Sequence, residues 1–225
     1  MINLSKRLKS IADFVLDDQN THGVIDVGCD HALLDIYLLE NKSTLKVIAS
    51  DVKEGPLKRA RENIYKYGLL DKIKLYLSDG LSFMEEDIDT IVISGMGADT
   101  IVDIFQRGKE QITNVKKIII SSNGKYPKVR ESISKLGFKI DKEKIVLEDG
   151  KYYIIIKFIK GEECYSSKEL YFGPYLLQNK NEMFSKYYQN MLNEKRKILE
   201  ALPESNTTKR SKLETEIKLL SAELI

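Results

Sequence analysis

Several features that mark other protein classes are absent from this sequence or scarce in it. The chain has no tryptophan, two cysteines and two histidines in 225 residues. Two cysteines form no disulfide framework, which fits a reducing compartment, and the few cysteine and histidine side chains show no metal-ligand spacing. No apolar run approaches the roughly 20 residues of a membrane span, and no apolar signal core follows the first residues. We therefore expect a cytoplasmic protein that binds neither a metal nor a membrane.

An excess of one charge is missing as well. The chain has 36 Lys and Arg against 34 Asp and Glu, which leaves a net charge of +2. Any basic surface for a nucleic acid must therefore be local. Charged residues make up 31% and hydrophobic residues 42%, as in globular proteins. A chain of this length can form one sizeable core with a smaller appended unit, and we expect a monomer.

The chain is organised around residues 24–31, where a short apolar run enters a turn containing Gly28. Apolar residues at helical spacing follow, so this stretch predicts a strand, a tight turn and a helix. Gly28 lets the backbone come close to a ligand, and Asp30 is placed to cap the helix. Asp26 adds a carboxylate at the same edge. Asp51 ends the next apolar run, roughly 20 residues further on, where an acidic residue would bind ribose hydroxyls.

This turn lacks the second and third glycines of the dinucleotide-binding pattern. Asp30 and Leu33 occupy those positions. A carboxylate there repels a diphosphate but suits a cationic, zwitterionic ligand. S-adenosyl-L-methionine is such a ligand, because it carries a sulfonium, an ammonium and an adenosine. The alternative, that Asp26 and Asp30 are only a turn carboxylate and a helix cap, is less favoured once Asp51 is considered.

Two later turns at predicted strand ends add candidate ligand contacts. Asp79-Gly80 places a carboxylate where open α/β sheets bind ligands. This carboxylate would accept a hydrogen bond from the exocyclic amine of an adenine. Gly95-Met96-Gly97 indicates close approach of the backbone to a ligand. The alternative for this second turn is a tight strand-to-helix connection with Met96 as filler.

The order of predicted elements indicates the fold class. Five strands alternate with helices, and Asp149-Gly150 then predicts an antiparallel hairpin. This order favours an α/β protein with a seven-stranded, mostly parallel sheet, by analogy the Rossmann-like sheet of class I methyltransferases. A leading helix with Arg7 should cover the sheet edge near the ligand. Arg7 has either a structural or solvated role or a contact with RNA phosphate.

The C-terminal part of the chain has a different pattern. A polar linker around residues 160–167 separates a methyltransferase domain, residues 1–165, from a helical domain, residues 166–225. A break at 203–208 divides two helical segments, which predicts an antiparallel coiled coil. The second segment has an apolar stripe at helical spacing, formed by Leu213, Ile217, Leu220 and Leu224. The basic residues of this arm are either solvated or grip an RNA backbone.

Together these motifs resemble the bacterial tRNA (adenine(22)-N1)-methyltransferases over nearly the whole chain. The segments that carry the resemblance are Leu4-Ser5-Lys6-Arg7-Leu8 and residues 26–32, 50–52, 55–57, 78–81, 95–97, 148–153 and 172–174. The chain departs from the usual family pattern at Ala98, often Gly, at Asp35, often Pro, and at Ser121-Ser122-Asn123, usually Gln-Pro-Asn.

The resemblance implies methylation of N1 of an adenine in tRNA, at position 22, with S-adenosylmethionine as cofactor and 1-methyladenosine as product. N1 has a free lone pair, so catalysis would come mainly from proximity and alignment, and the base must be extruded from the folded RNA. Residues 94–97 differ from the Asn/Asp-Pro-Pro-aromatic motif of exocyclic-amine methyltransferases, which argues against an amine target. Two alternatives are a methyltransferase that acts on a protein or small molecule, and a non-catalytic module that binds adenosylmethionine or RNA.

The predicted site residues follow from these motifs. Asp26, Asp30 and His31 are the catalytic candidates. We expect Asp26 and Asp30 near the methionine end of the cofactor and the reacting methyl. His31 either helps to position the substrate or only occupies the helix start. The predicted cofactor-binding residues are Asp26, Gly28, Asp30, His31, Asp51, Val52, Asp79, Gly80, Gly95, Met96 and Gly97.

Overall fold

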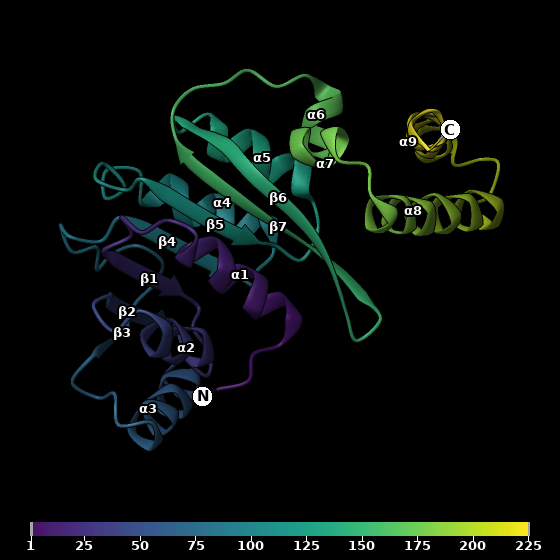
Figure 1. Ribbon diagram of the computed structural model, residues 1–225. Coiled ribbons are helices and arrows are strands. Elements are labelled where there is room, and N and C mark those ends of the chain that lie inside the picture. The colour runs from purple at the N-terminus through teal and green to yellow at the C-terminus, as the bar shows by residue number, and fades with distance from the viewer. Residues whose placement is uncertain (1, 225) are drawn as a thin grey trace. The chain divides into compact units, whose positions relative to one another are not determined.

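The computed structural model describes residues 2–224 as two compact units, the first ending at Leu177 and the second beginning at Gln178. The first unit is a seven-stranded sheet with helices on both faces (Figure 1). Its strands are β1 (Gly23–Val27), β2 (Lys46–Asp51), β3 (Ile73–Leu77), β4 (Thr90–Ser94), β5 (Lys117–Ser121), β6 (Phe138–Glu148) and β7 (Lys151–Lys160). The helices up to residue 178 are α1 (Lys6–Leu16), α2 (Leu33–Asn41), α3 (Glu54–Lys66), α4 (Ala98–Arg107), α5 (Tyr126–Ser134), α6 (Ser167–Phe172) and α7 (Pro174–Gln178).

The strand order confirms the predicted sheet. The order is β3-β2-β1-β4-β5-β7-β6, with the first five strands parallel to one another and β7 antiparallel to both of its neighbours. The chain leaves β1 toward β2 and β3 on one side and returns to β4 on the other. In open α/β sheets, ligands bind at such a reversal, outside the carboxyl ends of the strands.

Helices on the two faces explain why the central strands are buried and mostly apolar. Helices α1, α2 and α3 pack against one another on one face, and α4, α5 and α6 form a second group (Figure 1). Every residue of β1 and β5 is buried. Parallel strands covered on both faces read as continuous apolar runs, which is the pattern of Ile118-Ile119-Ile120 in β5.

The hairpin between β6 and β7 turns at the predicted dipeptide. Asp149 and Gly150 have φ of 48° and 75°. Two successive residues with positive φ form the type of turn that matches the twist of antiparallel strands, and Asp-Gly is a favoured sequence for it. The hairpin signal in the sequence is thereby confirmed.

The first unit extends further along the chain than we expected. The side chains of Arg130 in α5 and Glu143 in β6 are wholly buried and form an ion pair at 2.8 Å. Arg130 also donates to the carbonyl oxygen of Leu170 at 2.8 Å, and the Tyr175 amide donates to Glu143 at 3.2 Å. These bonds tie α6 and α7 to the first unit, so this unit ends at Leu177 rather than at the predicted residue 165.

The second unit is a helical hairpin of α8 (Glu182–Ala201) and α9 (Thr207–Glu223). Leu213 and Leu220 are buried, as the apolar stripe predicts. The chain just before α8 meets the end of α9 through the Lys180–Glu223 ion pair, so the two helices run antiparallel. A regular coiled coil stays a prediction. Among the residues described, no helix is long and apolar enough to cross a membrane.

Candidate active site

A cleft of about 420 Å³ opens at the carboxyl ends of β1, β2 and β4. It lies at the reversal of strand order, where the fold predicts a ligand. Its lining combines the start of α1, the β1–α2 turn and the ends of β2 and β4. The lining residues are Arg7, Leu8, Asp26, Gly28, Cys29, Asp30, His31, Leu33, Leu34, Asp51, Ser94, Gly95 and Met96. The fold thus brings most of the predicted site residues together.

The β1–α2 turn holds its backbone against two neighbouring strand ends. The amides of Gly28 and Cys29 both donate to the carbonyl oxygen of Ser50 in β2, at 2.8 and 3.0 Å. Gly28 has φ of +81°, and a Cβ at this position would overlap the terminal methyl of Met96, which follows β4. The positive φ therefore favours glycine here, and any side chain would also have to displace the end of Met96.

Asp30 does not cap α2, contrary to the prediction. The N-cap position belongs to Ala32, which is left-handed and makes no side-chain cap bond. Asp30 lies two residues before it, and a capping side chain must stand at the N-cap itself. The Asp30 carboxylate instead accepts a bond from Arg59 of α3 at 2.9 Å and lies 3.4 Å from Nε2 of His31. Asp30 and His31 are about half exposed and form the rim of the cleft.

Two carboxyl groups are buried at the inner end of this site. Asp26 lines the cleft at 5% exposure, and Asp35, in the first turn of α2, is 0% exposed. Burial raises the pKa of Asp26 to about 7; the negative charge of Asp51 adds to this shift and Arg7 opposes it. Burial, and then the charge of Asp26, raise the pKa of Asp35 well above its ordinary range, against the pull of its own amide. Burial and the neighbouring charge therefore favour the protonated form of Asp35. Asp35 was not among the predicted site residues.

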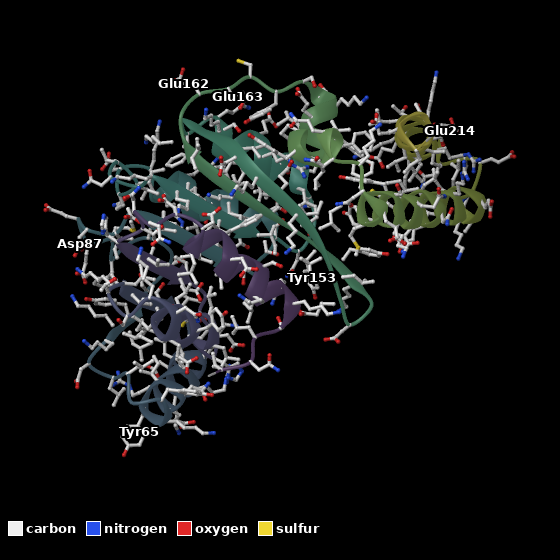
Figure 2. All side chains as sticks on the ribbon, viewed as in Figure 1. Tyr65, Asp87, Tyr153, Glu162, Glu163 and Glu214 are labelled. Carbon is white, nitrogen blue, oxygen red and sulfur yellow. The ribbon has the colours of Figure 1, made fainter. Side chains whose placement is uncertain are left out.

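Arg7 supplies positive charge to the cleft. Its guanidinium lies over the ring of Tyr153, with 4.9 Å between Cζ and the ring centroid, and its amide donates to Glu148 at 3.1 Å. Tyr153 stands on β7 and lies beside α1 in Figure 2. A Cβ on Gly95 would lie 3.4 Å from Nη1 of Arg7. These contacts agree with the structural alternative for Arg7, but its place in the cleft was missed by sequence reasoning.

Asp51 stands at the end of β2, as predicted. Its carboxylate accepts a hydrogen bond from the Lys53 amide at 2.9 Å. This bond fixes the carboxylate at the strand end while the side chain stays partly exposed. That is the position from which an acidic residue binds ribose hydroxyls in nucleotide-binding sheets.

Four predicted cofactor residues do not line the cleft, namely Val52, Asp79, Gly80 and Gly97. Arg107 of α4 binds both oxygens of Asp79, at 2.7 and 3.0 Å, and these bonds lower the pKa of Asp79. Val52 is 61% exposed next to Asp51. Gly97 is the N-cap residue of α4. The Asp79–Arg107 pair joins segments far apart in the chain, so no local signal revealed it.

The loop after β5 holds the Gly95-Met96 turn of the cleft in place. The side-chain amide of Asn123 donates to the carbonyl oxygen of Gly95 at 2.7 Å, and its backbone N–H donates to the carbonyl oxygen of Met96 at 2.8 Å. Asn123 therefore fixes the turn that lines the cleft without lining it.

The donor set fits S-adenosylmethionine. The buried carboxyl of Asp26 matches a cationic group, and Asp51 at the rim matches a ribose. Within residues 2–224, no group of three or more His, Cys, Asp or Glu side chains is arranged to hold a metal ion.

The sheet and the cleft at its strand reversal define a Rossmann-like methyltransferase. Magnesium protoporphyrin IX methyltransferase from Synechocystis, 16% identical, shares this fold with a TM-score of 0.59 over 69% of this chain and 79% of that one. The family model for tRNA (adenine(22)-N(1))-methyltransferase matches residues 24–222. The chain belongs to this family, whose members are S-adenosylmethionine-dependent and methylate N1 of adenine 22 in tRNA.

Individual relatives agree with this membership. The tRNA (adenine(22)-N(1))-methyltransferase of Bacillus subtilis is 30% identical over 218 residues, which are 94% of this chain and 90% of that one. Sp1610 of Streptococcus pneumoniae, solved in complex with S-adenosyl-L-methionine, has a TM-score of 0.88 at 32% identity, over 99% and 100% of the two chains. TrmK of M. capricolum, solved with S-adenosyl-homocysteine, has a TM-score of 0.86 at 30% identity, over 98% and 97%. The enzyme class and the cofactor expected from the sequence are confirmed, and the two alternative functions are set aside.

Proposed function

We propose that the cleft binds S-adenosylmethionine with Asp51 at the ribose and Asp26 at the methionine end, and presents it to N1 of the adenine. The observation that carries this assignment is that Asp26, Gly28 and Asp51 meet in one cleft at the reversal of strand order. Within residues 2–224 the Asp51 carboxylate receives one backbone hydrogen bond and keeps capacity for hydroxyl donors. Gly28 leaves the backbone open to close approach.

The chemistry asks little acid or base work of the protein. When bound, the cofactor supplies a methyl group on sulfur, which passes to the N1 lone pair while the electrons of the broken C–S bond stay on sulfur. The positive charge thereby moves to the base, and no residue removes a proton. The task of the chain is alignment and stabilisation of this charge. Asp26 lies inside the cleft and supplies the negative potential.

Asp30 and His31 are placed to meet the RNA side of the site. Their side chains are 59% and 45% exposed, and Arg59 holds Asp30 from α3. We assign them to orienting the extruded base at the rim, with Asp30 favouring the methylated, cationic product. The buried Asp26 is then the cofactor-facing member of the three catalytic candidates.

The α8–α9 hairpin is the proposed grip on the tRNA backbone. Exposed lysines are available on both helices, while several other basic residues serve the hairpin itself. The strand ends of a single sheet form the cleft, and we propose that a monomer carries out the reaction. Because the substrate is tRNA, we also propose that the protein acts in the cytoplasm.

The assignment is tested by titration calorimetry and nucleoside mass spectrometry on the same variants. Asp51→Ala should lose cofactor binding, and Asp30→Ala should keep it but form less 1-methyladenosine on tRNA. A tRNA with guanine at position 22 should remain unmodified. Asp79→Ala serves as the matched control, since Arg107 occupies both of its oxygens and we expect a smaller effect than at Asp51. Equal affinity of wild type and Asp51→Ala would refute the ribose assignment.

A further inference from the structure

Two buried carboxyl groups lie in or next to the cleft, although the methyl transfer requires no acid or base. Asp26 lines the cleft on β1. Asp35 stands one residue beyond Leu34, which also lines the cleft, and its side chain is wholly buried. Neither oxygen of Asp35 makes a hydrogen bond to another side chain or amide within residues 2–224. We call Asp26 and Asp35 the cleft carboxyl pair.

The groups around this pair limit the charge that it can carry. Asp51 at the end of β2 adds negative charge, and Arg7 of α1 supplies the positive charge. The thiol of Cys29 is kept neutral because burial and the three carboxyls raise its pKa. Two negative charges in one buried volume are too costly, so the second carboxyl keeps its proton. Apart from its own amide, Asp35 has no hydrogen-bond partner within residues 2–224 that would favour ionisation, so we assign that proton to Asp35.

Asp26 is the member of the pair that can change charge. It lines the cleft, and Arg7 favours its ionised form. S-adenosylmethionine has a sulfonium, an ammonium and a carboxylate, and so a net charge of +1. S-adenosylhomocysteine lacks the sulfonium and is neutral overall. A cation beside Asp26 stabilises the carboxylate, whereas the neutral product offers no charge at sulfur.

We propose that Asp26 releases one proton when S-adenosylmethionine binds, with Asp35 protonated throughout, and that this proton coupling makes the cleft prefer the cationic cofactor to its neutral product. After transfer the positive charge resides on the methylated base. Once that base has left, Asp26 takes a proton back from solvent, and the neutral cleft holds S-adenosylhomocysteine weakly. The charge of the cleft thus follows the charge of its ligand.

Titration calorimetry on the full-length wild-type enzyme tests this coupling. Runs in two buffers with different protonation enthalpies count the protons exchanged on binding. At pH 6 we expect release of about one proton with S-adenosylmethionine and none with S-adenosylhomocysteine. The Kd for S-adenosylmethionine should rise about tenfold from pH 8 to pH 6, while that for S-adenosylhomocysteine stays level. Equal proton release with both ligands, or none with either, overturns the proposal.

Two matched variants assign the proton within the pair. Asp26→Asn should abolish proton release, flatten the pH profile of Kd and bring the two ligands to similar affinities. Asp35→Asn should keep the release and the profile, because an amide replaces a carboxyl that is already uncharged. Release that survives Asp26→Asn but disappears in Asp35→Asn would assign the proton to Asp35 and overturn the proposal.

A measurement on the wild-type protein covers the case in which a variant fails to fold. Carbon-13 NMR of labelled aspartate carboxyls follows each titration directly. The Asp26 signal should titrate near neutral pH in the free enzyme and move to lower pH with S-adenosylmethionine, but not with S-adenosylhomocysteine. An Asp26 carboxyl that is already ionised at pH 6 in the free enzyme contradicts the coupling.

Discussion

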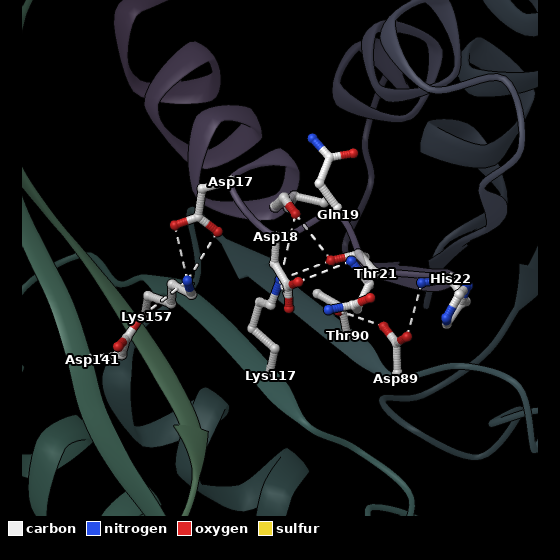
Figure 3. A network of polar contacts seen from close by, with 12 residues as sticks. Asp17, Asp18, Gln19, Thr21, His22, Asp89, Thr90, Lys117, Asp141 and Lys157 are labelled. Carbon is white, nitrogen blue, oxygen red and sulfur yellow. Dashed lines mark hydrogen bonds and ion pairs between the residues drawn. The ribbon is translucent and has the colours of Figure 1, made fainter.

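Helix α1 connects two regions that treat buried charge in opposite ways. At its C-terminal end, Lys117 and Lys157 are only 4% and 5% exposed, yet both are paired (Figure 3). The ammonium of Lys117 donates to the Thr21 hydroxyl at 2.7 Å and lies 3.4 Å from Asp18. Lys157 binds both oxygens of Asp17 at 2.9 Å. We call these five residues the lysine network.

At the N-terminal end of α1, the cleft carboxyl pair lacks such partners. Asp26 and Asp35 are as deeply buried as the two lysines, but neither carboxyl group accepts a hydrogen bond from another residue within residues 2–224. Buried polar groups are normally satisfied, because an unmet bond costs stability. The lysine network meets that requirement within the protein. In the carboxyl pair, a bound proton or a ligand must meet that requirement. The cost of burying these carboxyls therefore favours binding of a cationic ligand.

The largest expected effect is the pH dependence that the buried Asp26 gives to the free energy of unfolding. Burial raises the pKa of Asp26 from 3.8 to about 7, so between these values the unfolded chain binds fewer protons than the folded one. The contribution of Asp26 to stability is therefore greatest at low pH and declines as pH rises to 7, by up to about 4 kcal/mol. Asp26→Asn should remove this decline. Between pH 4 and pH 7 the variant should therefore lose less free energy of unfolding than the wild type. Urea unfolding at both pH values measures it, and an unchanged difference between the two pH values would contradict the burial argument.

Loss of cofactor binding without loss of stability is the next largest effect. Asp51→Ala removes charge-assisted hydrogen bonds to the ribose, each worth about 1.5–3 kcal/mol. We expect an affinity at least roughly tenfold weaker by calorimetry. The unfolding midpoint should stay close to that of wild type, because Asp51 is partly exposed and holds only one backbone amide. A variant that binds normally, or one that unfolds, would show that Asp51 is not a dedicated ligand residue.

The lysine network should respond in the opposite manner. Asp17→Ala leaves the buried ammonium of Lys157 with Asp141, 3.0 Å away, as its remaining partner. We expect a loss of about 2 kcal/mol in the free energy of unfolding with unchanged cofactor affinity. Asp13→Ala is the matched control on α1, since its pair with Lys9 is half exposed on both sides and should contribute below about 0.5 kcal/mol. Equal losses in the two variants would mean that burial of the network adds nothing.

Local spacing was enough to predict the frame of this molecule. The alternation of apolar runs with helical segments gave the sheet, and Asp149-Gly150 gave the hairpin, because turn chemistry is a property of adjacent residues. Gly28 and Asp51 were predicted for the same reason, since the positions of a strand-end glycine and of the following acidic residue are fixed by one βαβ unit.

Tertiary pairing was not predictable in this way. Asp30 was expected to cap a helix, but a left-handed Ala32 takes that position. Asp79 was expected near an adenine, but Arg107 from another helix binds it. Arg7 and Asp35 acquire their places only when α1 and α2 pack on the sheet. The electrostatics of the site therefore depend on which charges find partners, and a single sequence does not specify those partners.

The same distinction between paired and free charge applies to the α8–α9 hairpin. Lys195 is paired with Glu216, and Arg210 donates to the carbonyl oxygens of Leu199 and Leu202 at 3.2 and 2.7 Å. Reversing these charges would disturb the hairpin itself. A second set of lysines is exposed and makes no ion pair within residues 2–224: Lys197, Lys209, Lys212 and Lys218.

Charge reversal of that second set, by Lys→Glu at all four positions, gives the smallest expected effect on the isolated protein. Stability and cofactor affinity should stay at the wild-type level. Affinity for tRNA should fall, and its salt dependence should become shallower by up to about 0.9 in the log–log slope for each phosphate that the variant no longer neutralises. Filter binding over a range of salt concentrations measures both quantities, and circular dichroism checks the hairpin. Wild-type affinity and slope in the variant would assign the hairpin to a structural or protein-binding role. A weaker but equally salt-dependent complex would mean that these lysines act through the fold rather than on phosphate.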